Sequence, residues 1–200
     1  LLKRISSGTT LAEMADDERA TIIAGSVIRD LPVTPPEATG FPTVERWALA
    51  FDRHRTRFDG STGPIPAQLV DKAERLLVDL QASRIKEALL HGDLHHRNIL
   101  LSGDNRWLAI DPKGVVGDPA YEAARLQHNP IPGFLNAPSP AAVARRRVDI
   151  LAKVLEEDRA RLLAWAFIDA VLAACWSVEE DGRHLDYHLA CARLFDELAV

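Results

Sequence analysis

The chain has 200 residues, 47% of them hydrophobic, and its formal net charge is -5 at pH 7. This hydrophobic content is sufficient for a packed core. The acidic balance argues against a nucleic-acid-binding protein, which normally has a basic face, and favours a cationic ligand. The two cysteines, Cys175 and Cys191, are too few for a disulfide framework. We therefore expect two buried thiols in a cytoplasmic protein, with no nucleic-acid or membrane partner.

Helical periodicity dominates the chain. Thr10 and Glu13 have the spacing of a capping box, and Asp118 followed by Pro119 is typical of a helix start. The longest apolar run, 162–176, contains Asp169 and is too short to cross a bilayer comfortably, so we expect a buried helix there. Helices are predicted over 10–29, 43–58, 67–90, 118–127, 140–158, 160–178 and 185–198.

One region departs from this helical period. The short apolar segments "NILL" (98–101) and "RWLAI" (106–110) are separated by "SGDN", which contains residues that tolerate the left-handed backbone of hairpin turns. This pattern predicts a β-hairpin among helices. The expected fold class is therefore mainly α with a small β-hairpin.

Polar side chains gather at one end of the predicted hairpin. In "HGDLHHRN", Asp93 precedes the first strand and Asn98 begins it. Asp111 follows the second strand. Because both positions lie at the same end of a hairpin, we expect the three side chains to converge. Carboxylate and amide oxygens suit Mg²⁺, which completes its shell with water and substrate phosphates. One carboxylate would remain free to act as a base.

Other interpretations of the same residues remain open at this point. Asp93 could cap a turn, and His91 and His95 have a spacing found in some zinc sites. No thiolate accompanies the histidines, and Gly92 and Asp93 interrupt a helix there. Lys113 could contact phosphate or solvent, and the arginines 145–147 are typical of a solvated helix face.

Asp93, Asn98 and Asp111 follow the order found in kinases. Kinases have a catalytic Asp, an Asn five residues later and a second Asp after the following strand. Gly92 stands where protein kinases carry Arg, and "IDPKG" stands where they carry Asp-Phe-Gly. With "LLKRISSGTTL", "LLHGDLHHRNILL" and "WLAIDPKGVVGDPAYEAA", these features resemble the aminoglycoside phosphotransferase superfamily. The resemblance is to its streptomycin 6-kinase group, the aminoglycoside/hydroxyurea antibiotic resistance kinases, and it extends to about residue 130.

The resemblance implies an enzyme that transfers the γ-phosphate of ATP to a hydroxyl of streptomycin or a related aminoglycoside, giving antibiotic resistance. In that family pattern Asp93 matches the catalytic aspartate, and Asn98 and Asp111 match the Mg²⁺ ligands. His91 would brace the catalytic loop. The remaining matched positions are Asp118 and Tyr121, which would have supporting roles. Leu2 and Arg4 in the hinge-like segment are the nucleotide-contact candidates, and Lys113 is a further supporting candidate.

The resemblance also predicts a domain organisation. Residues 1–8 would form a hinge beside adenine, and residues 9–200 a helical C-terminal lobe of a protein-kinase-like fold. This lobe would contain the catalytic loop at 91–98 and the metal-binding turn at 111–114. No glycine-rich phosphate loop or strand lysine precedes the hinge-like segment, so we expect the N-terminal nucleotide lobe to be absent from this chain.

The acceptor-binding candidates are acidic residues of the C-terminal helices, because streptomycin carries guanidinium groups that carboxylates bind through paired hydrogen bonds. They are Asp169, Glu179, Glu180 and Asp186. The segment "EEDGRHLD" (179–186) could instead be a polar connection between helices. Two alternatives to an aminoglycoside kinase remain: a non-catalytic kinase-like remnant or binding module, and a choline-like small-alcohol kinase.

Overall fold

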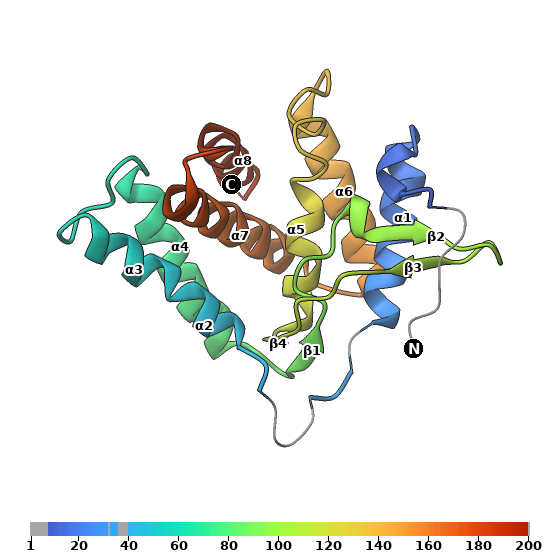
Figure 1. Cartoon of the computed structure of the whole chain (residues 1–200), viewed down its shortest axis with the longest axis horizontal. Coiled ribbons are helices and arrows are strands. Elements are labelled where there is room, and N and C mark those ends of the chain that lie inside the picture. The colour runs from blue at the N-terminus through green and yellow to red at the C-terminus, as the bar shows by residue number, and fades with distance from the viewer. Residues whose placement is uncertain (1–7, 32, 36–39, 200) are drawn as a thin grey trace.

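The protein is described by a computed structural model that covers residues 8–31, 33–35 and 40–199 (Figure 1). The nucleotide-contact candidates Leu2 and Arg4 lie outside these described residues. The helices are α1 (Asp17–Asp30), α2 (Val44–Ala48), α3 (Ala50–Arg57), α4 (Ala67–Ala82), α5 (Ala124–Gln127), α6 (Pro140–Leu155), α7 (Arg159–Glu180) and α8 (Leu185–Leu198). The strands are β1 (Ala88–Leu90), β2 (Ile99–Leu101), β3 (Trp107–Ala109) and β4 (Val115–Gly117), and short 3-10 turns are η1 (Leu11–Glu13), η2 (His96–Asn98) and η3 (Pro119–Ala123).

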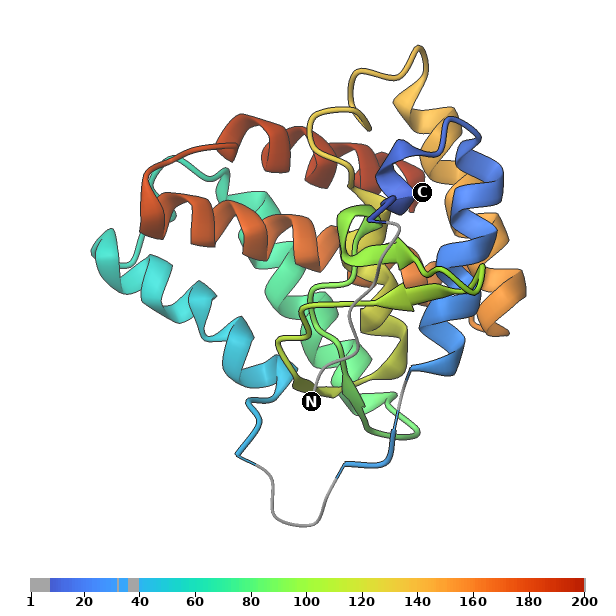
Figure 2. The ribbon, with the colours of Figure 1, turned by 45° about the vertical axis from the view of Figure 1, so that its right-hand side comes forward.

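Helix α7 is the centre of the core. It packs against α8, α4, α5, α3 and α6, and it lies antiparallel to α8 (Figure 2). By length and composition it could cross a membrane, but 78% of its most apolar 18-residue window is buried inside the fold. The expected buried helix is confirmed, and so are the buried free thiols of Cys175 and Cys191, which lie on α7 and α8.

The two small sheets lie between two groups of helices. Figure 2 shows α7 and α8 on one side and α1 with α6 on the other, with the strands between them. The predicted hairpin is confirmed: β2 pairs antiparallel with β3, and Asn105 in its turn has φ +60°. This hairpin brings the end of η2 and the end of β3 to the same edge, where the Ile110 N–H donates to the Asn98 carbonyl at 2.9 Å.

Two predicted helices are interrupted in the structure. The capping box of Thr10 and Glu13 forms, with the Thr10 N–H 2.8 Å from Glu13 Oε1, but it opens only the single turn η1. A second cap, Asp16, accepts a hydrogen bond from the Arg19 N–H and starts α1. The predicted helix 43–58 divides at Leu49, whose ψ of -8° ends α2 before α3 begins.

The prediction of a helix over 67–90 is wrong at its end. Helix α4 stops at Ala82, and residues 88–90 form β1, which pairs antiparallel with β4. A three-residue apolar run fits a buried helix as well as a strand, so periodicity could not separate them. The pairing places Leu90 opposite Val115, and therefore holds the segments 91–93 and 111–114 next to each other.

Candidate active site

Glu122 anchors the loop that follows β1. Its carboxylate accepts hydrogen bonds from the backbone N–H groups of His91 (2.6 Å) and Gly92 (3.1 Å). The side chain is on η3 and the residue is only 2% exposed. Burial raises the pKa of Glu122 to about 7, although the two backbone hydrogen bonds act in the opposite direction. Sequence reasoning missed this residue; an acidic side chain inside the apolar turn "AYEAA" was the available signal.

His91 connects the same loop to the end of β3. Its Nδ1 accepts the Asp93 N–H at 3.3 Å, which leaves Nε2 to donate to the Ile110 carbonyl at 2.8 Å. The carbonyl of His91 accepts from the N–H groups of Lys113 (2.9 Å) and Gly114 (3.1 Å). Both ring nitrogens of this buried histidine are thus engaged within the loop network.

Gly92 is required by close packing. Its φ is +82°, and a Cβ at this position would lie 2.7 Å from Trp47 Cη2 and 2.9 Å from Val115 Cγ1. Both the left-handed backbone and these contacts disfavour any side chain. The glycine therefore lets the loop turn tightly and direct Asp93 away from the core.

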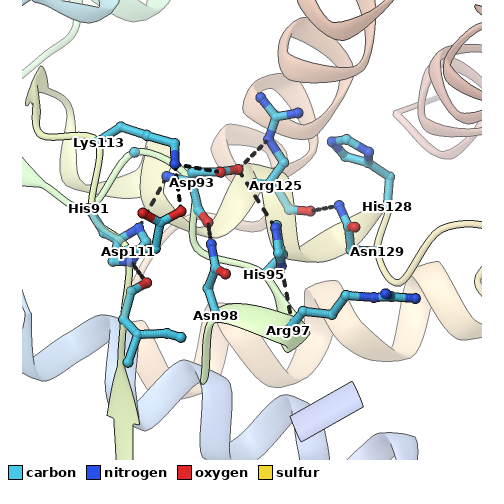
Figure 3. A network of polar contacts seen from close by, with 12 residues as sticks. His91, Asp93, His95, Arg97, Asn98, Asp111, Lys113, Arg125, His128 and Asn129 are labelled. Carbon is cyan, nitrogen blue, oxygen red and sulfur yellow. Dashed lines mark hydrogen bonds and ion pairs between the residues drawn. The ribbon is translucent and has the colours of Figure 1, made fainter. Parts of the chain in front are cut away.

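The Asp93 carboxylate lies among three nitrogen groups, and among the described residues none of them is within hydrogen-bond distance of it. Arg125 Nε is 3.8 Å from Oδ1, His95 Nε2 is 3.9 Å from Oδ1, and Lys113 Nζ is 3.9 Å from Oδ2 (Figure 3). The side chain is 28% exposed. Burial lowers the pKa of His95, so near pH 7 the two cationic neighbours are Arg125 and Lys113. The carboxylate oxygens remain able to accept a hydroxyl proton.

Asn98 and Asp111 belong to the same network. Asn98 Nδ2 donates to the Asp93 carbonyl at 2.9 Å, and the Asn98 carbonyl accepts from the Ile110 N–H at 2.9 Å. Asp111 follows β3 with φ +60°, and its side chain is 65% exposed. Lys113 Nζ lies 2.6 Å from Asp111 Oδ2, and this neighbour lowers the pKa of Asp111. The structure therefore brings the predicted metal-ligand pair and Asp93 together (Figure 3).

The zinc alternative has no support in this geometry. Both ring nitrogens of His91 are used within the loop, and His95 Nδ1 accepts the Arg97 N–H at 3.2 Å. Among the described residues, no group of three or more His, Cys, Asp or Glu side chains could hold a metal ion.

A polar pocket of about 340 Å³ lies between the end of α7 and the start of α8. Arg125, which also faces Asp93, lines it together with Trp176, Glu180, Asp181 and His188. Of the acceptor candidates from the sequence, Glu180 alone is among its lining residues. Sequence reasoning missed Arg125 and did not single out Asp181.

The other acceptor candidates lie elsewhere. Glu179 forms a bidentate pair with Arg53, at 2.8 and 3.2 Å, and Asp186 is not among the residues lining the pocket. Asp169 is 1% exposed, and its carboxylate binds Tyr121 Oη (2.9 Å) and His128 Nε2 (2.7 Å). An acceptor in the pocket would therefore not reach the Asp169 carboxylate directly.

Comparison with known proteins decides the family. The model of the aminoglycoside/hydroxyurea antibiotic resistance kinase family matches residues 1–182. The chain belongs to this family. It is 31% identical over 194 residues to streptomycin 6-kinase of Streptomyces glaucescens, covering 93% of this chain and 60% of that one. It is 32% identical over 191 residues to hydroxyurea phosphotransferase of Kitasatospora aureofaciens, covering 90% and 51%.

Solved structures show the fold of the family member. A choline kinase of Streptococcus pneumoniae matches with a TM-score of 0.67 at 14% identity, covering 98% of this chain and 68% of that one. An aminoglycoside phosphotransferase of Streptomyces rimosus matches with a TM-score of 0.54 at 18% identity, covering 80% and 64%. The predicted mainly-α, protein-kinase-like fold and the resemblance are confirmed. The chain spans between half and two thirds of the length of the curated relatives.

Proposed function

We propose that these 200 residues form the catalytic and acceptor-binding lobe of an ATP-dependent phosphotransferase that modifies streptomycin or a related aminoglycoside and so confers antibiotic resistance. Residues 1–8 would be the hinge beside adenine, with Leu2 and Arg4 as nucleotide contacts. The observation that supports this most is the Asp93 carboxylate, free to accept a proton beside Asn98 and Asp111.

The reaction follows from this arrangement. The oxygen of an acceptor hydroxyl attacks the γ-phosphorus of ATP, and a new O–P bond forms. The bond from the γ-phosphorus to the β,γ-bridging oxygen breaks, and ADP leaves with the electron pair. The hydroxyl proton passes to an Asp93 oxygen. The protein acts mainly by alignment and charge, since phosphoryl transfer requires little covalent chemistry from side chains.

Asn98 and Asp111 fit a magnesium site that depends on bound nucleotide. Their side chains offer hard oxygen donors, and the Asp111 carboxylate is 65% exposed, so that phosphates of a bound nucleotide would have access to it. When bound, Mg²⁺ would neutralise charge on the phosphates. Lys113 would then give up its contact with Asp111 and become available to a phosphate oxygen.

The acceptor site is the polar pocket beside Arg125. Glu180 and Asp181 place carboxylates there, and guanidinium groups form paired, charge-assisted hydrogen bonds with carboxylates. The net charge of -5 acts in the same direction, because it attracts a cationic acceptor.

A panel assay separates the proposal from its alternatives. The complete natural protein that contains these residues is incubated with ATP and Mg²⁺, and streptomycin, hydroxyurea and choline are tested separately as acceptors. We expect phosphorylated streptomycin by mass spectrometry. Phosphorylated hydroxyurea or choline alone would assign a different acceptor, and no product with any acceptor would favour the non-catalytic remnant.

A further inference from the structure

We propose that Arg125 is a positioning residue: Asp169, buried in α7, fixes the guanidinium, and the guanidinium orients the Asp93 carboxylate toward the acceptor hydroxyl. This inference rests on the phosphotransfer function proposed above. It assigns Asp169 to the support of Asp93, in place of the acceptor contact expected from the sequence.

Arg125 spans the two carboxylates with different parts of one rigid group. Its Nη2 is 3.2 Å from Asp169 Oδ1. Its Nε is 3.8 Å from Asp93 Oδ1 (Figure 3). The Nε atom is buried and has no hydrogen-bond partner among the described residues. A buried N–H group without a hydrogen-bond partner lowers the stability of the fold, so an unpaired Nε at this position needs a physical explanation. The nearby Asp93 carboxylate, on the path of the acceptor, provides one.

Two further side chains hold the Asp169 carboxylate, one of them through Oδ1, the same oxygen that Arg125 contacts. Tyr121 Oη and His128 Nε2 both bind its carboxylate, at 2.9 and 2.7 Å. Burial alone would raise the pKa of Asp169, but Arg125 and these two hydrogen bonds outweigh it and lower the pKa to about 2. An ionised carboxylate at 1% exposure requires a cation, which keeps Arg125 in place.

The Trp176 ring limits Arg125 further, because the guanidinium carbon lies 5.5 Å from its centroid. Arg125 therefore has one preferred orientation. At 3.8 Å it attracts Asp93 without forming the hydrogen bond that would occupy an oxygen lone pair. Asp93 is thus restrained in direction while it remains free to accept the hydroxyl proton.

The test uses the complete natural protein with three variants: Arg125→Gln, Asp169→Asn and the double variant. Two rates are measured: phosphorylation of streptomycin, and hydrolysis of ATP in the absence of an acceptor. Circular dichroism gives the folded fraction of each variant, and each rate is divided by the concentration of folded protein. We expect each single variant to lower kcat by about 10- to 100-fold, the range that a small misplacement costs. The KM for ATP should stay within about twofold, because neither side chain faces the nucleotide. The double variant should be no slower than Arg125→Gln, since both act through one contact.

Two further variants act as controls. Arg125→Lys keeps one charge but cannot span both carboxylates, so its kcat should lie between those of the wild type and Arg125→Gln. Arg55→Gln removes an arginine that binds Glu74 and Asp71 between α3 and α4, away from the site. It should change stability but not kcat.

Each failure has its own signature. A wild-type protein that neither phosphorylates streptomycin nor hydrolyses ATP would overturn the proposed function and the inference with it. An active wild type with Arg125→Gln above half of its kcat would overturn the inference alone. The inference would also be overturned if the fold-loss in kcat of the double variant equalled the product of the two single losses, because the two residues would then act independently.

Discussion

At the scale of single residues, Glu122 links the catalytic loop to the core. Its carboxylate accepts hydrogen bonds from the backbone N–H groups of both His91 and Gly92, and the residue lies 2% exposed on η3. Its folded-state pKa of about 7 lies above the ordinary value of 4.5. Its contribution to stability is therefore fully present below pH 4.5 and is lost as the pH rises through about 7.

Glu122→Gln should remove this titration. Glutamine keeps the shape but carries no charge, so the difference in unfolding free energy between variant and wild type should change by up to about 3 kcal/mol between acid and neutral pH. The wild type should lose stability relative to the variant as pH rises. Urea unfolding of both proteins at about pH 5 and about pH 8 measures this. Buried histidines titrate in both proteins and cancel, so a constant difference would show that Glu122 has no raised pKa.

A second prediction at this scale concerns Mg²⁺ binding by Asn98 and Asp111. Two oxygen-donating side chains are too few to hold Mg²⁺ strongly, so nucleotide phosphates should supply part of the coordination. In the complete natural protein, calorimetry should show Mg²⁺ binding at least about tenfold tighter with ATP than without it. Asp111→Asn should remove that gain. Equal Mg²⁺ affinity in both conditions would contradict the assigned site.

At the scale of elements, Asp118 joins η3 to α7. Its Oδ1 accepts the Ala120 N–H at 3.0 Å and starts the turn that carries Glu122. Its Oδ2 accepts from Trp165 Nε1 at 3.0 Å and also binds the Arg161 guanidinium. One buried carboxylate therefore sets the position of η3 relative to the core helix.

Asp118→Ala should destabilise the protein by about 3 kcal/mol, because it removes a helix cap and leaves a partly buried arginine unpaired. The matched control is Asp16→Ala, which removes an exposed cap at the start of α1 and should cost about 1 kcal/mol. Chemical denaturation of both variants measures the difference. Equal losses would mean that the contacts of Asp118 with α7 contribute little.

An element could be predicted from the sequence when residues close to one another in the chain determine it. Helices α6, α7 and α8 follow from apolar periodicity, and the β2–β3 hairpin follows from its turn residues, because neighbours in sequence determine both. Strand β1 was missed, since its pairing with β4 joins residues nearly thirty positions apart. The same holds for Glu122 and Arg125, whose partners come from distant segments. Asp93, Asn98 and Asp111 were identified because a family motif records their spacing.

At the scale of the whole molecule, the chain has its own core but, as proposed, only one side of an active site. Helix α7 is surrounded by protein, and buried side chains extend from η1 to α8. In kinases, a glycine-rich loop and a lysine hold the nucleotide phosphates. We expect neither of them among these 200 residues.

The isolated 200-residue chain should therefore unfold cooperatively on heating yet transfer no phosphate from ATP to streptomycin. Differential scanning calorimetry and mass spectrometry of the acceptor measure the two properties. The complete natural protein under the same conditions is the positive control. Steady phosphorylation by the isolated chain would show that its nucleotide site lies within these residues.

The most direct test of the central claim is the effect of Asp93→Asn in the complete natural protein, with kcat for streptomycin and ATP affinity measured together. Asp149→Asn, an exposed carboxylate on α6, is the control. Because the proposed role of Asp93 is to face the acceptor and accept its proton, we predict a loss in kcat of about 10²- to 10⁴-fold with nearly unchanged ATP affinity. A variant that retains more than about a tenth of the wild-type kcat would contradict the role of Asp93 as base.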